Sequence, residues 1–300
     1  MFSNNLAPNT TKNIEDMFKN VRGIEMYVLI ATGNRTKIDY FNSFIRYFKY
    51  LTGIKLIPIT ISDMDSEYKL DYPEPYYSFR ENARLKADCV YFDINEGKIT
   101  GSHILKTHND PFMILTNDSG LCIQELDGWP GVKTKRCYEE VGTRTSAEAI
   151  IKEIDSKLGV YRDDYGNYDN NKLHAAYRSS TCVIVGNLKN RHNHPYTVVR
   201  SASHDVGIFD PRIMDNNLLI ETMWDITTLI NRYDDRIVRY SSNPISKTNI
   251  ETLMLACEPI YKSFMISMTD AIMRISKDFE INDNCNMEES NNITIKVKEN

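Results

Sequence analysis

A short stretch of the chain, residues 27–37, combines residue types that are suited to binding an anion. Its first five residues are continuously apolar, which predicts a strand that is buried on both faces. Residues 32–34 (Thr, Gly and Asn) are typical of a turn and a helix N-cap, and Lys37 follows in the predicted helix. Backbone N–H groups at the start of a helix, together with a lysine, can bind phosphate. The same kind of turn also occurs for geometric reasons alone.

Two carboxylates could bring a metal ion to such a site. Glu74 lies between Pro73 and Pro75, where a rigidly held carboxylate could bind a metal or could equally face solvent. Asp118 follows the apolar run 112–115, which predicts that it lies at the end of a strand and at an edge of the sheet. Ligands of open α/β sheets bind at such strand ends, whereas an ordinary turn aspartate is the alternative interpretation.

Two lysines could add positive charge to the same pocket. Lys86 lies on the predicted helix 78–93, which begins with a capping box. Its side chain either reaches the phosphate pocket or lies in solvent. Lys135 follows the stiff turn 128–131, which would hold a basic side chain in a fixed direction.

Strands that alternate with helices must position these residues. Apolar runs predict strands, and apolar residues at helical spacing predict helices. The predicted strands are 27–31, 54–61, 112–116, 121–123, 175–187, 195–203 and 206–209, and the predicted helices are 35–51, 78–93, 145–158, 225–231 and 246–274. This order predicts an α/β fold with a mixed, twisted β-sheet flanked by helices.

The pattern predicts one domain with two terminal segments. Residues 26–275 form the predicted domain. Residues 1–25 are expected to be a peripheral or disordered extension. Residues 276–300 are expected to be a disordered tail, because they are strongly polar.

Composition narrows the class of protein. The 300 residues carry a formal net charge of −5, which argues against a nucleic-acid polymer as the main partner. No apolar stretch is long enough to span a membrane, and the N-terminus has no signal-peptide core. The six cysteines show no CxxC pair, which favours reduced thiols in a cytoplasmic protein. The pair His192 and His194 is interpreted as surface rather than as a metal site.

Four elements of the chain resemble the inosine triphosphate pyrophosphatases, which hydrolyse non-standard purine nucleoside triphosphates. The family's Thr/Ser-Gly-Asn-x-x-Lys element matches residues 32–37, and its Phe-x-Glu-Asn-Ala-x-x-Lys-Ala element matches residues 79–87. Its Asp-Ser-Gly-Leu element matches residues 118–121, and its Leu-x-Gly-x-Pro-Gly turn matches residues 126–131. Fainter matches follow at 207–212, 223–225 and 243–246, so the resemblance covers roughly residues 27–260.

The resemblance implies a two-lobed fold with an active-site cleft between the lobes. It implies an enzyme, usually a homodimer, that uses Mg²⁺ to convert NTP to NMP and pyrophosphate. In this reading Glu74 and Asp118 hold the metal, and Asp118 also activates the attacking water. Trp224 would stack on the purine and Asp225 would hydrogen-bond to it. The other substrate-binding residues that it implies are Thr32, Gly33, Asn34, Arg35, Thr36, Lys37, Lys86, Ser119, Lys135, Ser242 and Lys247.

Several positions depart from the family pattern. Asn117 stands where the family has an acid, which would remove one negative charge from the metal environment. Ser242 and Lys247 replace residues that read the purine 6-oxo group, so base choice should be relaxed or redirected. One alternative is therefore a catalytically degenerate protein of the same fold that binds a nucleotide or a partner. A less favoured alternative is the related pyrophosphatase family that acts on modified pyrimidines.

Overall fold

A five-stranded mixed sheet forms the centre of the computed structural model. The structure describes residues 18–21, 23–72, 74–75, 77–107, 111–133, 153, 156–161, 164, 174–187, 195–208 and 258–296. The strands are β1 (Glu25–Ile30), β2 (Lys55–Thr60), β3 (Phe112–Ile123), β4 (His174–Gly186) and β5 (Tyr196–Ile208), in the order β2-β1-β3-β4-β5. β1 is parallel to β2 and β3, whereas β4 is antiparallel to β3 and β5. The predicted α/β class with a mixed sheet is confirmed.

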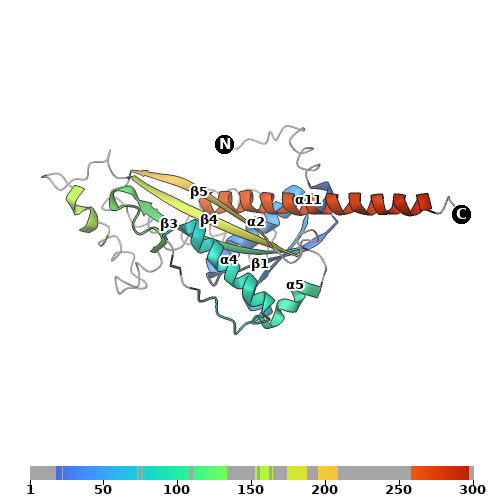
Figure 1. The fold of residues 1–300 in the computed structure, drawn as a ribbon. Helices are drawn as coiled ribbons and strands as arrows, with labels where there is room; N and C mark the ends of the chain where they lie inside the picture. The colour runs from blue at the N-terminus through green and yellow to red at the C-terminus, as the bar shows by residue number, and fades with distance from the viewer. Residues whose placement is uncertain are drawn as a thin grey trace.

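Helices cover both faces of the sheet (Figure 1). The α-helices are α2 (Arg35–Thr52), α3 (Ile61–Met64), α4 (Phe79–Asn95), α5 (His103–Thr107) and α11 (Glu258–Lys296). The short 3₁₀ helices are η1 (Lys19–Val21), η2 (Thr100–Ser102), η3 (Gln124–Leu126), η4 (Gly131–Lys133) and η5 (Gly159–Tyr161). Within these described segments, no helix is long and apolar enough to cross a lipid bilayer.

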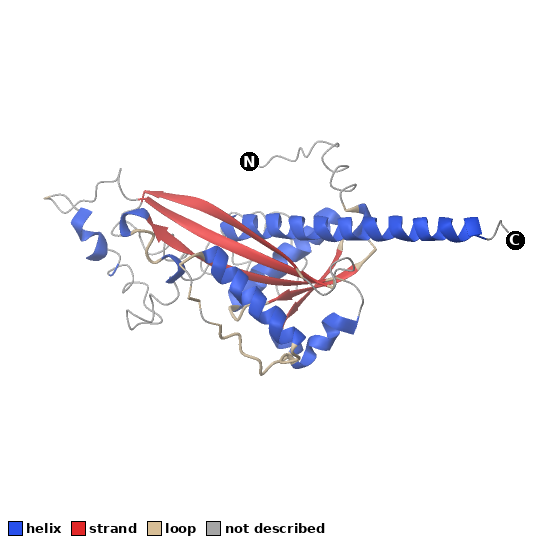
Figure 2. Cartoon of the chain, in the orientation of Figure 1, coloured by secondary structure: helices blue, strands red, loops and turns tan. Residues whose placement is uncertain are grey.

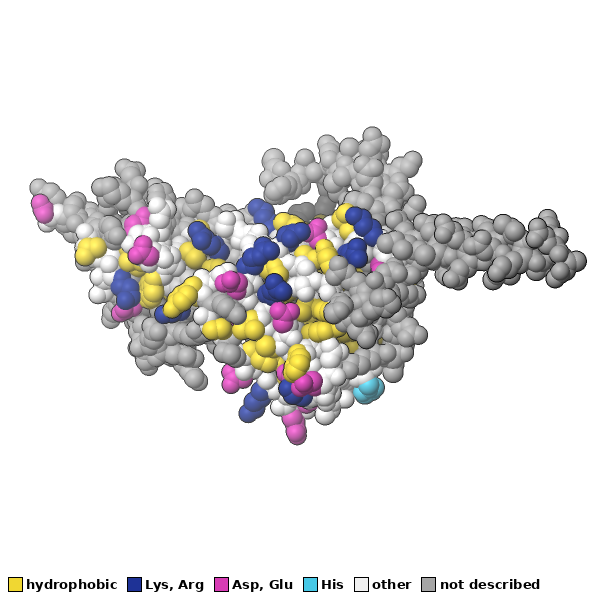
Figure 3. All heavy atoms as spheres, viewed as in Figure 1, with side chains coloured by type: hydrophobic (Ala, Val, Ile, Leu, Met, Phe, Trp, Pro, Cys, Tyr) yellow, Lys and Arg dark blue, Asp and Glu magenta, His cyan; other side chains and the backbone are white. Residues whose placement is uncertain are grey.

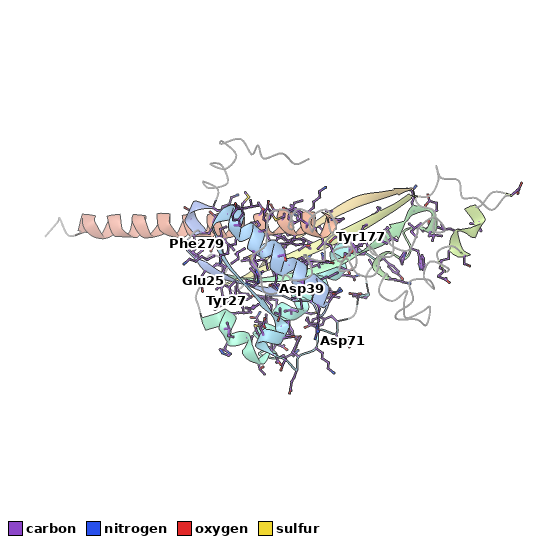
Figure 4. The ribbon with its side chains drawn as sticks, turned by 180° about the vertical axis from the view of Figure 1, so that it is seen from behind. Glu25, Tyr27, Asp39, Asp71, Tyr177 and Phe279 are labelled. Carbon is purple, nitrogen blue, oxygen red and sulfur yellow. The ribbon has the colours of Figure 1, made fainter. Side chains whose placement is uncertain are left out.

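The two faces of the sheet build two cores, because successive side chains of a strand point to opposite sides. Met113 and Leu115 of β3 belong to the core that β1 and β4 form with α2 and α11. Ile114, between them, belongs to the core that includes Ala83, Ala87 and the rest of the buried side of α4. Figures 1 and 4 show α4 and α2 on opposite sides of the sheet. Successive side chains of β3 therefore alternate between the α4 face and the α11 face of the sheet.

β3 is one continuous strand, which corrects the predicted turn at residues 117–120. These turn-type residues pair with β4 without interruption, from Asn117 opposite Thr181 to Gly120 opposite Arg178. Asp118 therefore lies inside a strand and not at its end. Local composition favours a turn here, but the antiparallel partner supplies the backbone hydrogen bonds that keep the segment extended. The predicted strands 195–203 and 206–209 are likewise one strand, β5.

Both terminal segments differ in part from the prediction. Phe18 and Val21 are buried, and the Phe18 ring lies 6.3 Å from that of Phe48, so this part of the extension belongs to the core. α11 continues to Lys296, through the segment expected to be disordered from residue 276. Ile272 and Ile275 are buried and Phe279 packs against the same core, whereas Figure 2 shows the last part of the helix extending beyond the sheet.

The contact between Gly101 and α3 gives a first stability prediction. A Cβ added at Gly101 would lie 2.4 Å from the carbonyl oxygen of Met64 and 2.8 Å from its Cα. We expect Gly101→Ala to lower the free energy of unfolding by about 1–3 kcal/mol, because the backbone must shift to remove the overlap. Urea denaturation followed by circular dichroism measures the change. Gly23→Ala is the control, since no described atom lies within 4 Å of its added Cβ. Equal midpoints for the two variants would contradict the prediction.

Candidate active site

The predicted phosphate-binding turn connects β1 to α2. Asn34 is the N-cap of α2, and its Oδ1 accepts a hydrogen bond from the backbone N–H of Lys37 at 3.3 Å. The Thr32 hydroxyl accepts one from the Asn34 N–H, also at 3.3 Å. Gly33 and Arg35 are exposed, and the side chain of Thr36 lies outside the described residues. The structure thus places an accessible N-terminus of an 18-residue helix directly after the strand.

Asp118 lies just beyond the carboxyl end of β1. The pairing of β1 with β3 ends at Leu115, and the Ala31 N–H donates to the Leu115 carbonyl at 2.8 Å. Asp118 is three residues further along β3, where β4 is its neighbour on one side. Asp118 therefore lies next to the phosphate turn, as expected for a ligand site at the strand ends of an open α/β sheet. It differs from the expectation only because β3, the strand that carries it, continues past it.

Three charged side chains converge on Asp118. Lys86 forms ion pairs with both carboxylates, with Glu74 and, at 3.6 Å, with Asp118. Burial raises the pKa of the Asp118 carboxyl, which is only 6% exposed. The positive charges of Lys86 and Lys37 act in the opposite direction, and the negative charge of Glu74 adds to the increase. The structure therefore brings together Lys37, Glu74, Lys86 and Asp118, which are 81 positions apart at most in the sequence.

Asn82 also contacts Asp118, although the sequence did not single it out. Its side chain is fully buried, and Nδ2 donates a hydrogen bond to Asp118 Oδ2 at 3.1 Å. Asn82 and Lys86 are four residues apart on α4, so they share one face of the helix. That spacing is the signal in the sequence: a polar residue one turn before Lys86, next to the buried Ala83.

Asn117 and Ser119 face away from Asp118. Asn117 Nδ2 donates hydrogen bonds to Ser179 Oγ at 2.8 Å and to Thr181 Oγ1 at 3.1 Å. Both hydroxyls also contact Ser263 of α11, which covers the face opposite to α4. Ser119 Oγ accepts a hydrogen bond from the Tyr177 hydroxyl, on the same α11 side of the sheet (Figure 4).

The position of Asn117 corrects the expectation that it alters the metal environment. Its side chain belongs to a polar contact between β4 and α11, and alternation along β3 separates it from Asp118. An acid at this position would point to the same side. The first departure from the family pattern therefore leaves the cluster around Asp118 intact.

Restoring an acid at this position is expected to harm the fold and not to improve the site. Asn117 Nδ2 also donates to the Ser180 carbonyl at 3.0 Å, and a carboxylate oxygen there would face that carbonyl with no proton between them. We expect Asn117→Asp to lower the free energy of unfolding by about 2–3 kcal/mol without strengthening Mg²⁺ binding. Urea denaturation and metal titration measure the two quantities. Asn95→Asp, at an exposed position on α4, is the surface control, and tighter metal binding by Asn117→Asp would contradict the prediction.

Five predicted site residues lie outside the described residues. They comprise the third lysine of the phosphate site and the residues assigned to the base: Lys135, Trp224, Asp225, Ser242 and Lys247. The cleft expected between two lobes would also involve segments 134–152 and 209–257, which lie outside as well.

The donor set around Lys86 fits a hard divalent cation. Glu74 and Asp118 offer carboxylate oxygens, and both already pair with the same ammonium group. Within the described ranges no three His, Cys, Asp or Glu residues form a metal-binding group. Mg²⁺ commonly takes one or two protein carboxylates and completes its shell with phosphate oxygens and water. The pair is therefore suited to Mg²⁺ whose remaining ligands are water or phosphate oxygens.

Known proteins are similar to part of this chain. A dITP/XTP pyrophosphatase of Campylobacter hominis is 27% identical over 134 residues, which cover 44% of this chain and 55% of that protein. A protein of Halalkalibacterium halodurans named as a non-canonical purine NTP pyrophosphatase homolog is 29% identical over 123 residues, covering 41% of this chain and 51% of that protein. The matched part spans about half the length of these relatives.

Solved structures of similar proteins include a HAM1 protein from Coxiella burnetii. It aligns with a TM-score of 0.45 and 16% identity, covering 82% of this chain and 100% of that one. A dITP/XTP pyrophosphatase from Mycobacterium abscessus aligns with a TM-score of 0.43 and 18% identity, covering 66% of this chain and 82% of that one. The model of the Ham1 family matches residues 28–198, which is more than half of the chain and includes the phosphate turn, Lys86 and Asp118. The chain therefore belongs to the Ham1 family.

Proposed function

We propose that the protein is a Mg²⁺-dependent nucleoside triphosphate pyrophosphatase that hydrolyses non-standard purine NTPs or dNTPs to NMP and pyrophosphate. The convergence of Lys37, Glu74 and Lys86 on the buried carboxylate of Asp118 carries this proposal. A triphosphate is strongly anionic, and a site for it needs several cations and a metal to spread the charge that develops during reaction. Relatives that are similar to part of the chain are named dITP/XTP pyrophosphatases, which supports the proposal.

Each side chain has a distinct role in the proposed reaction. The turn at residues 32–37 and the first N–H groups of α2 bind phosphate oxygens, and Lys37 and Lys86 neutralise part of their charge. Asp118 accepts a proton from the water that attacks the α-phosphorus. The bond from the α-phosphorus to its bridging oxygen breaks, and pyrophosphate leaves. Asn82 keeps the Asp118 carboxylate in one orientation through its hydrogen bond.

Glu74 and Asp118 would hold the Mg²⁺ ion. When bound, the ion neutralises charge on the phosphate oxygens and makes the phosphorus a better electrophile. Lys86 lies between the two carboxylates and keeps them close together when the substrate is absent.

The finer assignments follow from the residues and the family. We propose an altered base preference, because Ser242 and Lys247 replace the family's readers of the purine 6-oxo group.

We propose that the protein is a cytoplasmic homodimer, because the inosine triphosphate pyrophosphatases that it resembles are usually homodimers. Cys89, Cys122 and Cys182 are free thiols, which supports a reducing compartment. The face seen in Figure 3 intersperses acidic and basic side chains, which is unlike the basic surface of nucleic-acid-binding proteins.

A catalytically degenerate nucleotide-binding protein of the same fold is the second candidate. Asn117 and the substitutions at Ser242 and Lys247 were its support. The first of these now carries no weight, since the Asn117 side chain lies on the α11 face of the sheet. A protein that only binds nucleotide has no chemical need for a buried carboxylate next to the phosphate turn.

A pyrophosphate-release screen separates the two candidates. The purified protein is incubated with Mg²⁺ and with dITP, XTP, dUTP or one of the standard NTPs, and NMP and pyrophosphate are quantified. We expect release from at least one non-standard purine nucleotide, and loss of release when EDTA removes the metal. Nucleotide binding without turnover on any of these substrates would overturn the proposed enzyme.

A further inference from the structure

The loop that carries Glu74 runs along the whole of α4. It comprises residues 65–78, between α3 and α4, and contains no helix or strand in its described part. Figure 2 shows this loop beside α4. Glu74 is the only one of the two proposed metal ligands that lies outside a regular element, because Asp118 is held inside β3. Its position therefore depends on what holds the loop.

A group of polar side chains holds the loop at the far end of α4. We call Tyr68, Tyr72, Asp93 and Lys98 the Asp93 cluster. The hydroxyls of Tyr68 and Tyr72 both donate to Asp93 Oδ2, that of Tyr72 at 2.6 Å, and the two hydroxyls also contact each other. Lys98 Nζ lies 3.0 Å from Asp93 Oδ1. One carboxylate near the end of α4 thus binds the loop at two tyrosines.

The charge of Asp93 makes these hydrogen bonds strong. Burial acts to raise its pKa, but the hydrogen bonds from Tyr68, Tyr72 and Lys98 outweigh that effect and lower it. Burial and the bond to Asp93 raise the pKa of Tyr68 to about 12, and the pKa of Tyr72 is raised for the same reasons. At neutral pH an ionised carboxylate therefore accepts from two neutral phenols, which is a charge-assisted arrangement.

A second contact fixes the start of the loop. Asp65 Oδ1 accepts hydrogen bonds from the N–H groups of Glu67 and Tyr68, at 3.1 and 3.0 Å. Asp65 Oδ2 accepts from the N–H and the hydroxyl of Thr100, at 3.0 and 2.9 Å. The loop is therefore tied to the segment after α4 before it reaches the Asp93 cluster.

The spacing of the contacts shows that the loop follows α4 in the opposite direction. Tyr72 contacts Asp93 near the end of the helix, Glu74 pairs with Lys86 in its middle, and Ser78 caps its start. The seven helical residues from 86 to 93 span about 10 Å. The chain from residue 72 to residue 74 can span at most about 7 Å, so little slack separates the two contacts. Moving Tyr72 would move Glu74.

We propose that Tyr72 and Asp93 are positioning residues that hold Glu74 in place for the metal ion. This inference rests on the proposed function, since it assigns Glu74 to the metal. Neither residue touches Asp118 or the phosphate turn through any contact described above. Their effect passes through the loop to Glu74, two residues beyond Tyr72.

Metal binding by two conservative variants tests the proposal. Asp93→Asn and Tyr72→Phe each remove part of the cluster without changing side-chain size greatly. Mn²⁺ binding to the free protein is followed by electron paramagnetic resonance, and the Mg²⁺ concentration that gives half of the maximal rate is measured separately. We expect the dissociation constant of Mn²⁺ and the half-maximal Mg²⁺ concentration to rise about tenfold each. Losses of this size are typical when residues that orient a metal ligand are changed. Excess Mg²⁺ should restore the wild-type maximal rate.

Two controls separate positioning from general stability. Asp71→Asn removes an exposed carboxylate from the same loop, next to Tyr72, and should leave metal binding unchanged (Figure 4). Ile45→Val weakens the core on the other side of the sheet, so it should lower the melting temperature without altering metal affinity. Should Asp93→Asn fail to fold, Tyr72→Phe decides by the same measurement.

The outcomes distinguish this inference from the proposed function. Metal binding by folded Asp93→Asn and Tyr72→Phe within twofold of that of the wild type would overturn the positioning role and leave the proposed function standing. A wild-type protein that binds no Mn²⁺ and releases no pyrophosphate would overturn both. Weaker metal binding in these variants, but not in Asp71→Asn or Ile45→Val, supports the proposal.

Discussion

Asp118→Asn is expected to lower the rate of pyrophosphate release by about a thousandfold or more. General-base catalysis contributes about 10²–10⁴-fold, and this substitution also removes one of the two carboxylates proposed to bind metal. The asparagine has the same shape, and its Oδ1 can still accept the hydrogen bond from Asn82. The fold should therefore be retained while the chemistry is lost. Release of pyrophosphate from the best substrate of the screen, with Mg²⁺ at saturation, measures the effect.

The exposed ion pair of Arg84 and Asp88 supplies the control for this experiment. The two side chains lie 3.4 Å apart on α4, and neither contacts Asp118. Asp88→Asn makes the same chemical change on the helix that carries Asn82 and Lys86, and it should keep nearly full activity. Equal activity of Asp118→Asn and Asp88→Asn would remove Asp118 from its assigned role, whichever substrate is used.

The parts of the site that local chemistry determines were predictable. The apolar run, the N-cap residue and the helical spacing after Lys37 specify β1, the turn and α2 without reference to the rest of the chain. The observed bounds of α2, Arg35–Thr52, differ by one residue from the predicted 35–51. Lys86 was placed on the correct helix for the same reason.

The parts that depend on strand pairing were not predictable. Residues 117–120 are turn-formers in isolation, and pairing with β4, about 60 residues later, keeps them in a strand. The same pairing decides that Asn117 faces α11 and that Asp118 faces α4. A substitution read from the sequence as a change in the metal site is therefore a change in how β4 packs against α11.

Contacts between distant side chains escaped the sequence for a similar reason. Asp93 accepts hydrogen bonds from residues 21 and 25 positions earlier, and no local pattern marks such a pair. Asn82 was visible only as a member of a motif, since its role depends on where β3 places Asp118. Local motifs indicated the kind of site, and the tertiary fold decides which side chains support it.

Lys86→Met should have the second largest effect, because Lys86 is the cation that both carboxylates share. It pairs with Glu74 and with Asp118, and the substitution would leave two like charges close together. It would also remove positive charge from the triphosphate site. We expect kcat/KM to fall about a hundredfold, which corresponds to about 2.7 kcal/mol of transition-state stabilisation.

The pH dependence of the Lys86→Met variant provides a second readout. Burial raises the pKa of the Asp118 carboxyl, and Lys86 opposes that increase, so removing the lysine should raise this pKa further. A base with a higher pKa becomes deprotonated only at higher pH, so the acid limb of the rate profile should shift upward. Arg84→Met, two residues away on α4, is the matched control and should shift neither the rate nor the profile. A fall in kcat/KM without any shift of the acid limb would separate the two roles, leaving Lys86 as a phosphate ligand that does not act on Asp118.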